Sequence, residues 1–253
     1  MIIIRKQNIY KYRNPYNHIM KTIDILKTIE EYPLITVNEF VKITGISPKY
    51  ARTYLSRLKK EKRLFRIEKG KYTTHDDALI FSSYIIIPSY ISFWTALRYY
   101  GLTEQLPIDI MIAAPKPKNT IVSRETRIRF FKTKHMWGYK KQRYMDFDIF
   151  VAEKEKAIID CLLHKNTPFD EIAKAIATKE FDKKKLIEYA IKTKNKSLIK
   201  RVGYLMEYFS MDSGSLSNYL DNNYITLDFS QKKTGKKDKK WKIIINRRLD
   251  DIY

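Results

Sequence analysis

The 253-residue sequence holds a single cysteine, Cys161, so it can form no internal disulfide. No stretch reaches the roughly 20 consecutive apolar residues that a membrane span needs, and the opening Met-Ile-Ile-Ile-Arg is too short for a secretory signal. Glycine and proline number only 7 and 8, which argues against collagen-like, low-complexity and disordered chains. These absences predict a folded, soluble protein of the cytoplasm.

Acidic residues are few compared with basic ones, since 28 Asp and Glu stand against 50 Lys and Arg and leave a formal net charge of +22. Codon bias or heat adaptation would spread this excess evenly along the chain. Instead, residues 1–75 carry +11, residues 76–227 carry +6 and residues 228–253 carry +5. An uneven basic excess indicates a polyanionic partner.

The first 75 residues contain signals for two helices in close succession. Apolar residues at helical spacing predict a helix over about residues 17–31, which Pro33 closes. Thr36 stands three residues before Glu39, which is the spacing of a capping box, and this predicts a second, shorter helix that Gly45 stops.

A third helix is predicted from Ser47, a good N-cap, and Pro48, which fits the first helical position, to about residue 61. Its apolar residues fall on one stripe, which must face the other two helices: Ala51, Tyr54, Leu55 and Leu58. The opposite face and its flanks are polar and basic: Lys49, Arg52, Thr53, Ser56, Arg57 and Lys60. Such a face offers groups that read bases and bind phosphates.

Residues 63–72 have the pattern of two short strands around a turn, which predicts a basic wing with Arg66, Lys69 and Lys71. Together with the three helices this is the plan of a winged helix-turn-helix. We therefore expect residues 1–75 to be a DNA-binding domain. The residues expected to read bases in the major groove are Lys49, Arg52, Thr53, Ser56 and Arg57. Those expected to hold phosphates are Lys60, Arg66, Lys69 and Lys71. The alternative is a three-helix subdomain used for protein contacts.

Residues 76–253 predict a larger mixed α/β (α+β) domain with a helical C-terminal part. The expected strands are residues 109–114, 127–131 and 146–151, with a final pair at 224–229 and 241–245. The expected helices are residues 92–100, 153–164, 169–178, 183–192 and 198–209. Residues 231–240 hold six lysines and read as a solvated loop in a basic C-terminal tail.

Three segments of this second domain carry a resemblance to a known family. They are YISFWTALRYYGLTEQLP at residues 90–107, AEKEKAIID at 152–160 and KRVGYLME at 200–207. In this order they resemble the signatures of the AbiEi antitoxin family, over about residues 20–210. The basic tail, including the lysine-rich segment 232–242, matches no part of that pattern.

The resemblance implies a transcriptional regulator and antitoxin of a type IV toxin–antitoxin (abortive infection) pair, encoded beside a nucleotidyltransferase-like toxin. The winged helix would repress its own operon by binding double-stranded operator DNA. A dimer or two cooperating monomers would both fit an inverted repeat. The second domain would counter the toxin, which classical members oppose without a stable complex. The runner-up interpretation is a non-catalytic protein- or RNA-binding module in which the winged helix serves assembly.

Catalysis and metal binding find little support in the residues. Asp146 and Asp148 would project from one face of an expected strand, as metal-binding acids do. However, the Gly-Ser helix start of a nucleotidyltransferase and the Glu-x-Lys of a nuclease are missing. Cys161 and His164 supply only two of the four ligands of a zinc site, and a buried cysteine is the more common case. There is no glycine-rich phosphate loop and no nucleophile elbow, so we expect no enzyme, no metal and no cofactor.

The three segments also have interpretations in terms of packing. Trp94, Leu97 and Tyr100 recur at helical spacing and are expected in the core. Gly203 is expected to permit a close contact between helices, and Asp160 to cap or bond a neighbouring loop.

Overall fold

The computed structural model describes residues 22–250, which begin with three helices: α1 (Thr22–Glu30), α2 (Val37–Thr44) and α3 (Pro48–Lys60). The expected start of the first helix at residue 17 lies outside the described residues. The predicted capping box is present on α2, because the Thr36 hydroxyl accepts from the Glu39 amide at 3.2 Å and the Glu39 carboxylate accepts from the Thr36 amide at 2.8 Å. Gly45, with φ at +71°, ends α2 in the left-handed conformation that glycine tolerates best.

A small antiparallel sheet of three strands follows α3 and completes the winged helix. Strands β2 (Phe65–Glu68) and β3 (Lys71–Thr73) form the predicted wing hairpin, and β1 (Ile35–Thr36), ahead of α2, pairs with β3. All four residues of the predicted apolar stripe on α3 are buried. They join one hydrophobic core with residues of α1, α2 and the sheet, among them Ile29, Phe40 and Tyr72.

The second part of the chain is built on a six-stranded mixed sheet with the order β6-β7-β5-β4-β9-β8. Its strands are β4 (Tyr90–Ile91), β5 (Asp109–Ala114), β6 (Ile121–Ser123), β7 (Thr126–Lys132), β8 (Tyr139–Tyr144) and β9 (Phe147–Ala152). The pairs β5–β7 and β4–β9 are parallel, and the other neighbours are antiparallel. The three strands predicted here are confirmed to within one residue at each end, whereas β4, β6 and β8 were not foreseen.

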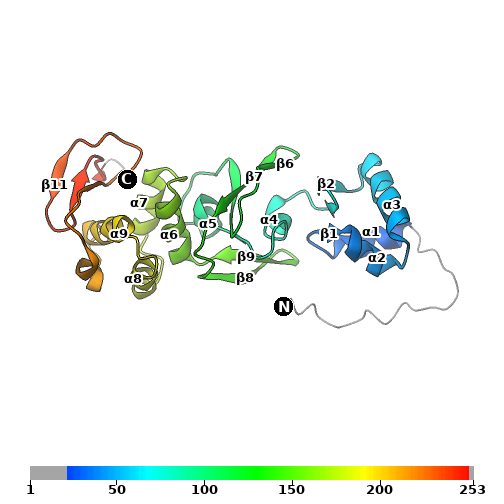
Figure 1. Ribbon diagram of the computed structural model, residues 1–253, viewed down its shortest axis with the longest axis horizontal. Helices are drawn as coiled ribbons and strands as arrows, with labels where there is room; N and C mark the ends of the chain where they lie inside the picture. Colours follow the sequence, from blue (N-terminus) through cyan, green and yellow to red (C-terminus); the bar gives the residue numbers. More distant parts are fainter. Residues whose placement is uncertain (1–21, 251–253) are drawn as a thin grey trace.

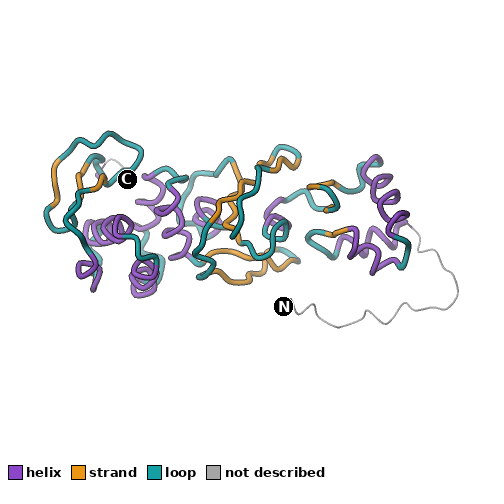
Figure 2. Tube along the Cα trace, in the orientation of Figure 1, coloured by secondary structure: helices purple, strands orange, loops and turns teal. Residues whose placement is uncertain are grey.

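Helices cover this sheet and extend beyond it. The short helices α4 (Ala78–Ser82) and α5 (Phe93–Tyr99) contact its central strands. Four longer helices follow the sheet: α6 (Lys154–His164), α7 (Phe169–Ala177), α8 (Lys183–Lys192) and α9 (Lys196–Tyr208). They lie on the far side of the sheet from the winged helix, so the molecule is elongated (Figure 1). The predicted mixed α/β fold with a helical C-terminal part is therefore confirmed, as the distribution of helix and strand in Figure 2 shows.

A turn of 3-10 helix, η1 (Gly214–Tyr219), leads into a last three-stranded sheet with the order β10-β12-β11. Strands β10 (Ile225–Thr226) and β12 (Ile243–Ile245) are the predicted final pair, and they run parallel. The expectation of a loop over residues 231–240 is wrong for residues 236–238, which form β11 (Lys236–Asp238) antiparallel to β12. Backbone pairing with an apolar strand outweighs the low strand propensity of lysine at this exposed edge.

Gly203 of α9 lies against an aromatic ring, not against a helix as expected. A Cβ atom added to Gly203 would lie 2.1 Å from two ring carbons of Trp241, in the C-terminal segment. The indole ring is 1% exposed, and its Nε1 donates to Glu207 at 2.8 Å. Burial opposes ionisation of Glu207, but hydrogen bonds from Lys240, Trp241 and Ser213 stabilise the carboxylate and lower its pKa. The ring, the glycine and the carboxylate thus hold the C-terminal segment on α9.

Two buried cations of α9 extend this attachment. The Nζ atom of Lys200 donates to Asp221 and to the carbonyl of Asn223, both at 2.5 Å. The guanidinium of Arg201 donates to the carbonyls of Thr226 at 2.8 Å and Leu227 at 3.0 Å. Four residues of segment 200–207 therefore contact the last part of the described chain: Lys200, Arg201, Gly203 and Glu207.

The second hydrophobic core runs through the sheet, α4 to α9 and the C-terminal strands. Leu97 is fully buried, and Trp94 and Tyr100 are partly buried against it, so their expected place in the core is confirmed. Leu34 and Ile67 of the winged helix also belong to this second core. Both residues lie within residues 1–75, so the winged helix contributes side chains to the core of the second part of the chain.

Candidate nucleic-acid interface

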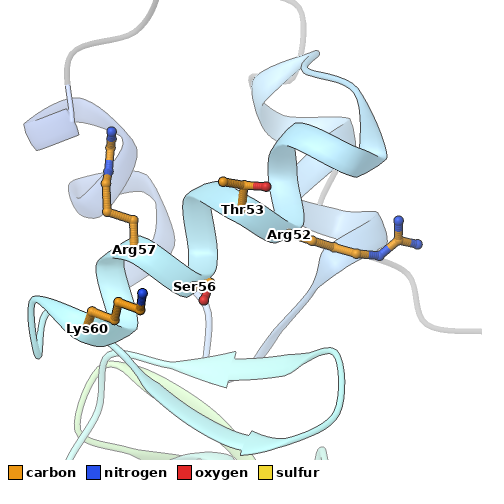
Figure 3. A pocket seen from close by; sticks show the side chains of 5 residues that line it. All are labelled: Arg52, Thr53, Ser56, Arg57 and Lys60. Carbon is orange, nitrogen blue, oxygen red and sulfur yellow. The ribbon is translucent and has the colours of Figure 1, made fainter.

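The outer face of α3 is where the structure brings the predicted base-reading residues together. Because the apolar stripe turns inward, the polar residues of α3 are left exposed: Lys49, Arg52, Thr53, Ser56, Arg57 and Lys60. All of these except Lys49 line one shallow hollow, and Figure 3 shows Arg52 and Arg57 extending from the helix in different directions. The exposed face of α3 thus presents long cationic side chains around two hydroxyls, a set able to contact phosphates and base edges together.

Most cations on this face have no acidic partner. Among residues 22–250, no carboxylate lies within 4.0 Å of the charged atoms of Lys49, Arg52 or Lys60. Arg57 is different, because its guanidinium lies 4.6 Å from the centre of the Tyr54 ring and 3.8 Å from Glu61. Both partners are on α3 itself, so they hold Arg57 in place at the surface, where it is still 54% exposed.

The predicted wing residues have different environments. Lys69 is exposed at the turn of the hairpin, and Arg66 is exposed with its Nε donating to the carbonyl of Glu68 at 3.3 Å. Lys71 was expected to be available to a phosphate, but its ammonium already has partners within the protein. Its ammonium is 3.0 Å from the Glu68 carboxylate and donates to the carbonyl of Ile85, in the second domain. These two partners engage the Lys71 ammonium, and its side chain is 28% exposed.

Contacts between the wing and the second domain were not visible in the sequence. Glu68 also accepts from Lys118 at 2.5 Å. Burial opposes its ionisation, but the bonds from Lys118 and Lys71 stabilise the carboxylate and lower its pKa. At the start of β2, the guanidinium of Arg124 lies 4.0 Å from the centre of the Phe65 ring. These contacts join residues more than 40 positions apart, so no local pattern could have shown them.

The acids considered for catalysis are not arranged as expected. Asp146 lies in the turn between β8 and β9 and not on a strand, because the hairpin turns at Met145 with φ at +49°. The carboxylate of Asp148, on β9, is 2.9 Å from the ammonium of Lys141 and 3.8 Å from Arg143. The two acids therefore do not share a strand face.

Cys161 and His164 are placed by packing. Cys161 is fully buried, as expected, and the Thr167 hydroxyl donates to its sulfur at 3.2 Å, while burial raises the pKa of the thiol. The imidazole of His164 meets the edge of Phe93 at 5.3 Å between ring centres. Within the described part of the chain, no group of three or more histidine, cysteine or acidic side chains could hold a metal ion.

Asp160 is fully buried and bonds a neighbouring loop, as expected, since Ser92 lies between β4 and α5. Its carboxylate accepts from the hydroxyls of Ser92 at 2.7 Å and Tyr90 at 3.2 Å, and it pairs with the buried ammonium of Lys156. Burial lowers the pKa of Lys156, although the charge of Asp160 and its hydrogen bond favour the protonated ammonium. This polar network joins segment 90–107 to segment 152–160 inside the second core.

A winged helix-turn-helix whose third helix exposes a basic face with few acidic partners is the architecture of DNA-binding transcriptional regulators. Residues 24–75 match the model of a family described as transcriptional regulator, AbiEi antitoxin. The resemblance stated from the sequence is thereby confirmed for this part of the chain, which includes α2, α3 and the wing. A search of curated proteins gave no match. No helix within residues 22–250 is both long and apolar enough to cross a membrane.

Proposed function

We propose that the chain is a sequence-specific DNA-binding repressor and the antitoxin of a type IV toxin–antitoxin pair. It autoregulates its operon and opposes a nucleotidyltransferase-like toxin. The observation that carries this proposal is the exposed basic face of α3, where Lys49, Arg52 and Lys60 have no acidic partner among the described residues, within a segment that matches the AbiEi antitoxin regulator family. The protein acts in the cytoplasm, where its operator and its toxin would both be found.

In this function α3 enters the major groove of the operator. The base-reading residues are Lys49, Arg52, Thr53, Ser56 and Arg57. The phosphate contacts are made by Lys60, Arg66 and Lys69. The ammonium of Lys71 instead joins Glu68 of the wing to the carbonyl of Ile85. The operator is an inverted repeat, which a dimer or two cooperating monomers would occupy.

The second domain carries the antitoxin activity without catalysing a reaction. The separation of Asp146 from Asp148 and the pairing of Asp148 with Lys141 support a non-catalytic role. The burial of Cys161 supports it as well, since a buried thiol with a raised pKa is a poor nucleophile.

The proposal is tested by titrating the full chain with its own upstream DNA and with scrambled DNA of equal length, at low and at physiological salt. We expect a preference for the upstream DNA that survives salt. Arg52→Ala should weaken binding to the upstream DNA by about 5- to 150-fold and relax specificity at one base pair, because a base contact provides about 1–3 kcal/mol of discrimination. Lys69→Ala should weaken binding to both DNAs alike. It should also reduce the slope of log affinity against log salt concentration by about 0.9.

Lys184→Ala is a matched control, since Lys184 is exposed on α8, far from α3 along the elongated molecule (Figure 1). It should leave both affinities within about twofold. Equal binding to upstream and scrambled DNA, falling steeply with salt, would refute the repressor function and leave nonspecific counterion release.

The antitoxin function is tested separately by co-expression with the neighbouring nucleotidyltransferase-like gene. The Arg52→Ala chain should lose repression of a reporter and still restore growth, because the two functions use different domains. Failure of the intact chain to restore growth would favour a protein- or RNA-binding module of another kind.

A further inference from the structure

A second basic hollow lies in the second domain, away from the winged helix. Three elements line it: residues 132–135 at the end of β7, residues 163–164 at the end of α6, and residues 193–197, which join α8 to α9. These elements come together because α6 contacts both α8 and α9 in the helical layer. The hollow is wide open to solvent and has a volume of about 550 Å³.

The lining of this hollow has four lysines and no acidic residue: Lys132, Lys134, Lys194 and Lys196. Of these four lysines, only Lys196 has a carboxylate of the described residues within 4.0 Å of its ammonium, that of Asp221 at 3.9 Å. The Lys196 side chain is still 58% exposed. Elsewhere in the same domain, lysines commonly have acidic partners, such as Lys185 with Glu153 at 2.7 Å. Four like charges gathered in a concavity repel one another unless an anion enters.

Uncharged hydrogen-bonding groups stand among these cations. His135 and His164 both line the hollow, and burial lowers the pKa of each imidazole. The N-terminus of α9 also opens here, with Asn195 capping the Leu198 amide at 3.0 Å. A helix N-terminus favours negative charge because its amides and its dipole both point at the ligand.

We infer that this hollow binds the phosphate group of a nucleotide or of a nucleic-acid strand. The cluster of lysines supplies the charge, the imidazoles and the amide end of α9 supply directional donors, and the concavity limits the ligand to one or a few phosphates. This site is separate from α3 and does not depend on the repressor function. It gives the second domain an anionic ligand of its own.

Histidine resonances provide a local readout, since the chain has only four histidines. ATP and an eight-nucleotide single-stranded RNA are titrated separately into the full chain, and the imidazole signals are followed by NMR. We expect the signals of His135 and His164 to shift and to saturate. The signal of His75, which packs against Phe147 near the winged helix, should stay in place. If ATP saturates the shifts, the ligand is a free nucleotide. If RNA saturates them and ATP does not, the ligand is a nucleic-acid strand.

A pair of double variants separates a built site from diffuse charge. Lys132→Gln with Lys134→Gln removes two charges from the hollow, and Lys183→Gln with Lys184→Gln removes two from the exposed start of α8. We expect the first to raise the Kd of the bound probe at least tenfold and the second to change it less than twofold. Thermal unfolding checks that both remain folded. Equal weakening by both doubles, or no shift of either imidazole with 10 mM ATP and 1 mM RNA, would overturn the inference.

Discussion

Replacing Gly203 with alanine should be among the most damaging small changes in the second domain. The added methyl would lie 2.1 Å from two carbons of the Trp241 ring and 2.7 Å from a third. Ordinary contacts of a Cβ atom begin at about 3.4 Å, so the ring would have to retreat by about 1.3 Å. It has little room to do so, because it is 1% exposed and its Nε1 is bonded to Glu207.

The expected cost follows from the two ways in which the ring could respond. If the ring stays buried, overpacking costs about 1–3 kcal/mol. If the ring is expelled, the loss approaches the roughly 3–5 kcal/mol of removing a buried tryptophan. A domain of this size loses about 2–4 °C in Tm per kcal/mol, so Gly203→Ala should lower the Tm by about 2–20 °C.

Differential scanning calorimetry of the full chain measures this change, and a double variant controls for its cause. In a background with Trp241→Leu the clash is absent, so adding Gly203→Ala should cost less than about 1 kcal/mol. A Tm within 1 °C of the parent for the single variant would refute the close contact. An equal cost in both backgrounds would show that Trp241 is not its source.

Three further changes test other contacts. Lys156→Met should destabilise by about 3–5 kcal/mol because it leaves the Asp160 carboxylate buried without its cation, and chemical denaturation should show that Asp160→Leu in the same chain recovers much of this loss. The lowered pKa of Glu207 means that its bonds stabilise the fold above pH about 4.5 and are lost as the pH falls further, so the stability difference between the parent and Glu207→Gln should shrink below pH 4. Glu68→Gln weakens the ion pairs with Lys71 and Lys118 at the wing, and faster amide exchange in the hairpin should follow while exchange in α2 is unchanged.

The winged helix could be predicted closely because its signals are local. The capping box of Thr36 with Glu39 and the N-cap of Ser47 each act within one turn of helix, and both are present in the structure. The inward stripe on α3 follows from helical periodicity alone. The exposed polar residues of α3 could therefore be named from the sequence, and their role in reading bases stays a prediction.

What could not be predicted depends on contacts between distant segments. Lys71 is basic and lies in a wing, so the sequence favoured a phosphate contact, but the carbonyl of Ile85 and the carboxylate of Glu68 hold it. Strand β11 has a composition typical of a loop and forms because β12 offers it an open edge. The hollow at His164 was overlooked for the same reason, since its lysines come from segments 60 residues apart.

The three segments that resemble the family make contacts that hold the fold together. They are distinct from the two surfaces proposed to bind ligands. Tyr90 and Ser92 of the first segment bind Asp160 of the second, and every polar contact of segment 200–207 described above reaches the C-terminal part. Neither basic hollow includes a residue from any of these three segments. The proposed DNA contacts of α3 and the proposed anion contacts of the second hollow can therefore change without any substitution in the three segments, because neither hollow takes a side chain from them.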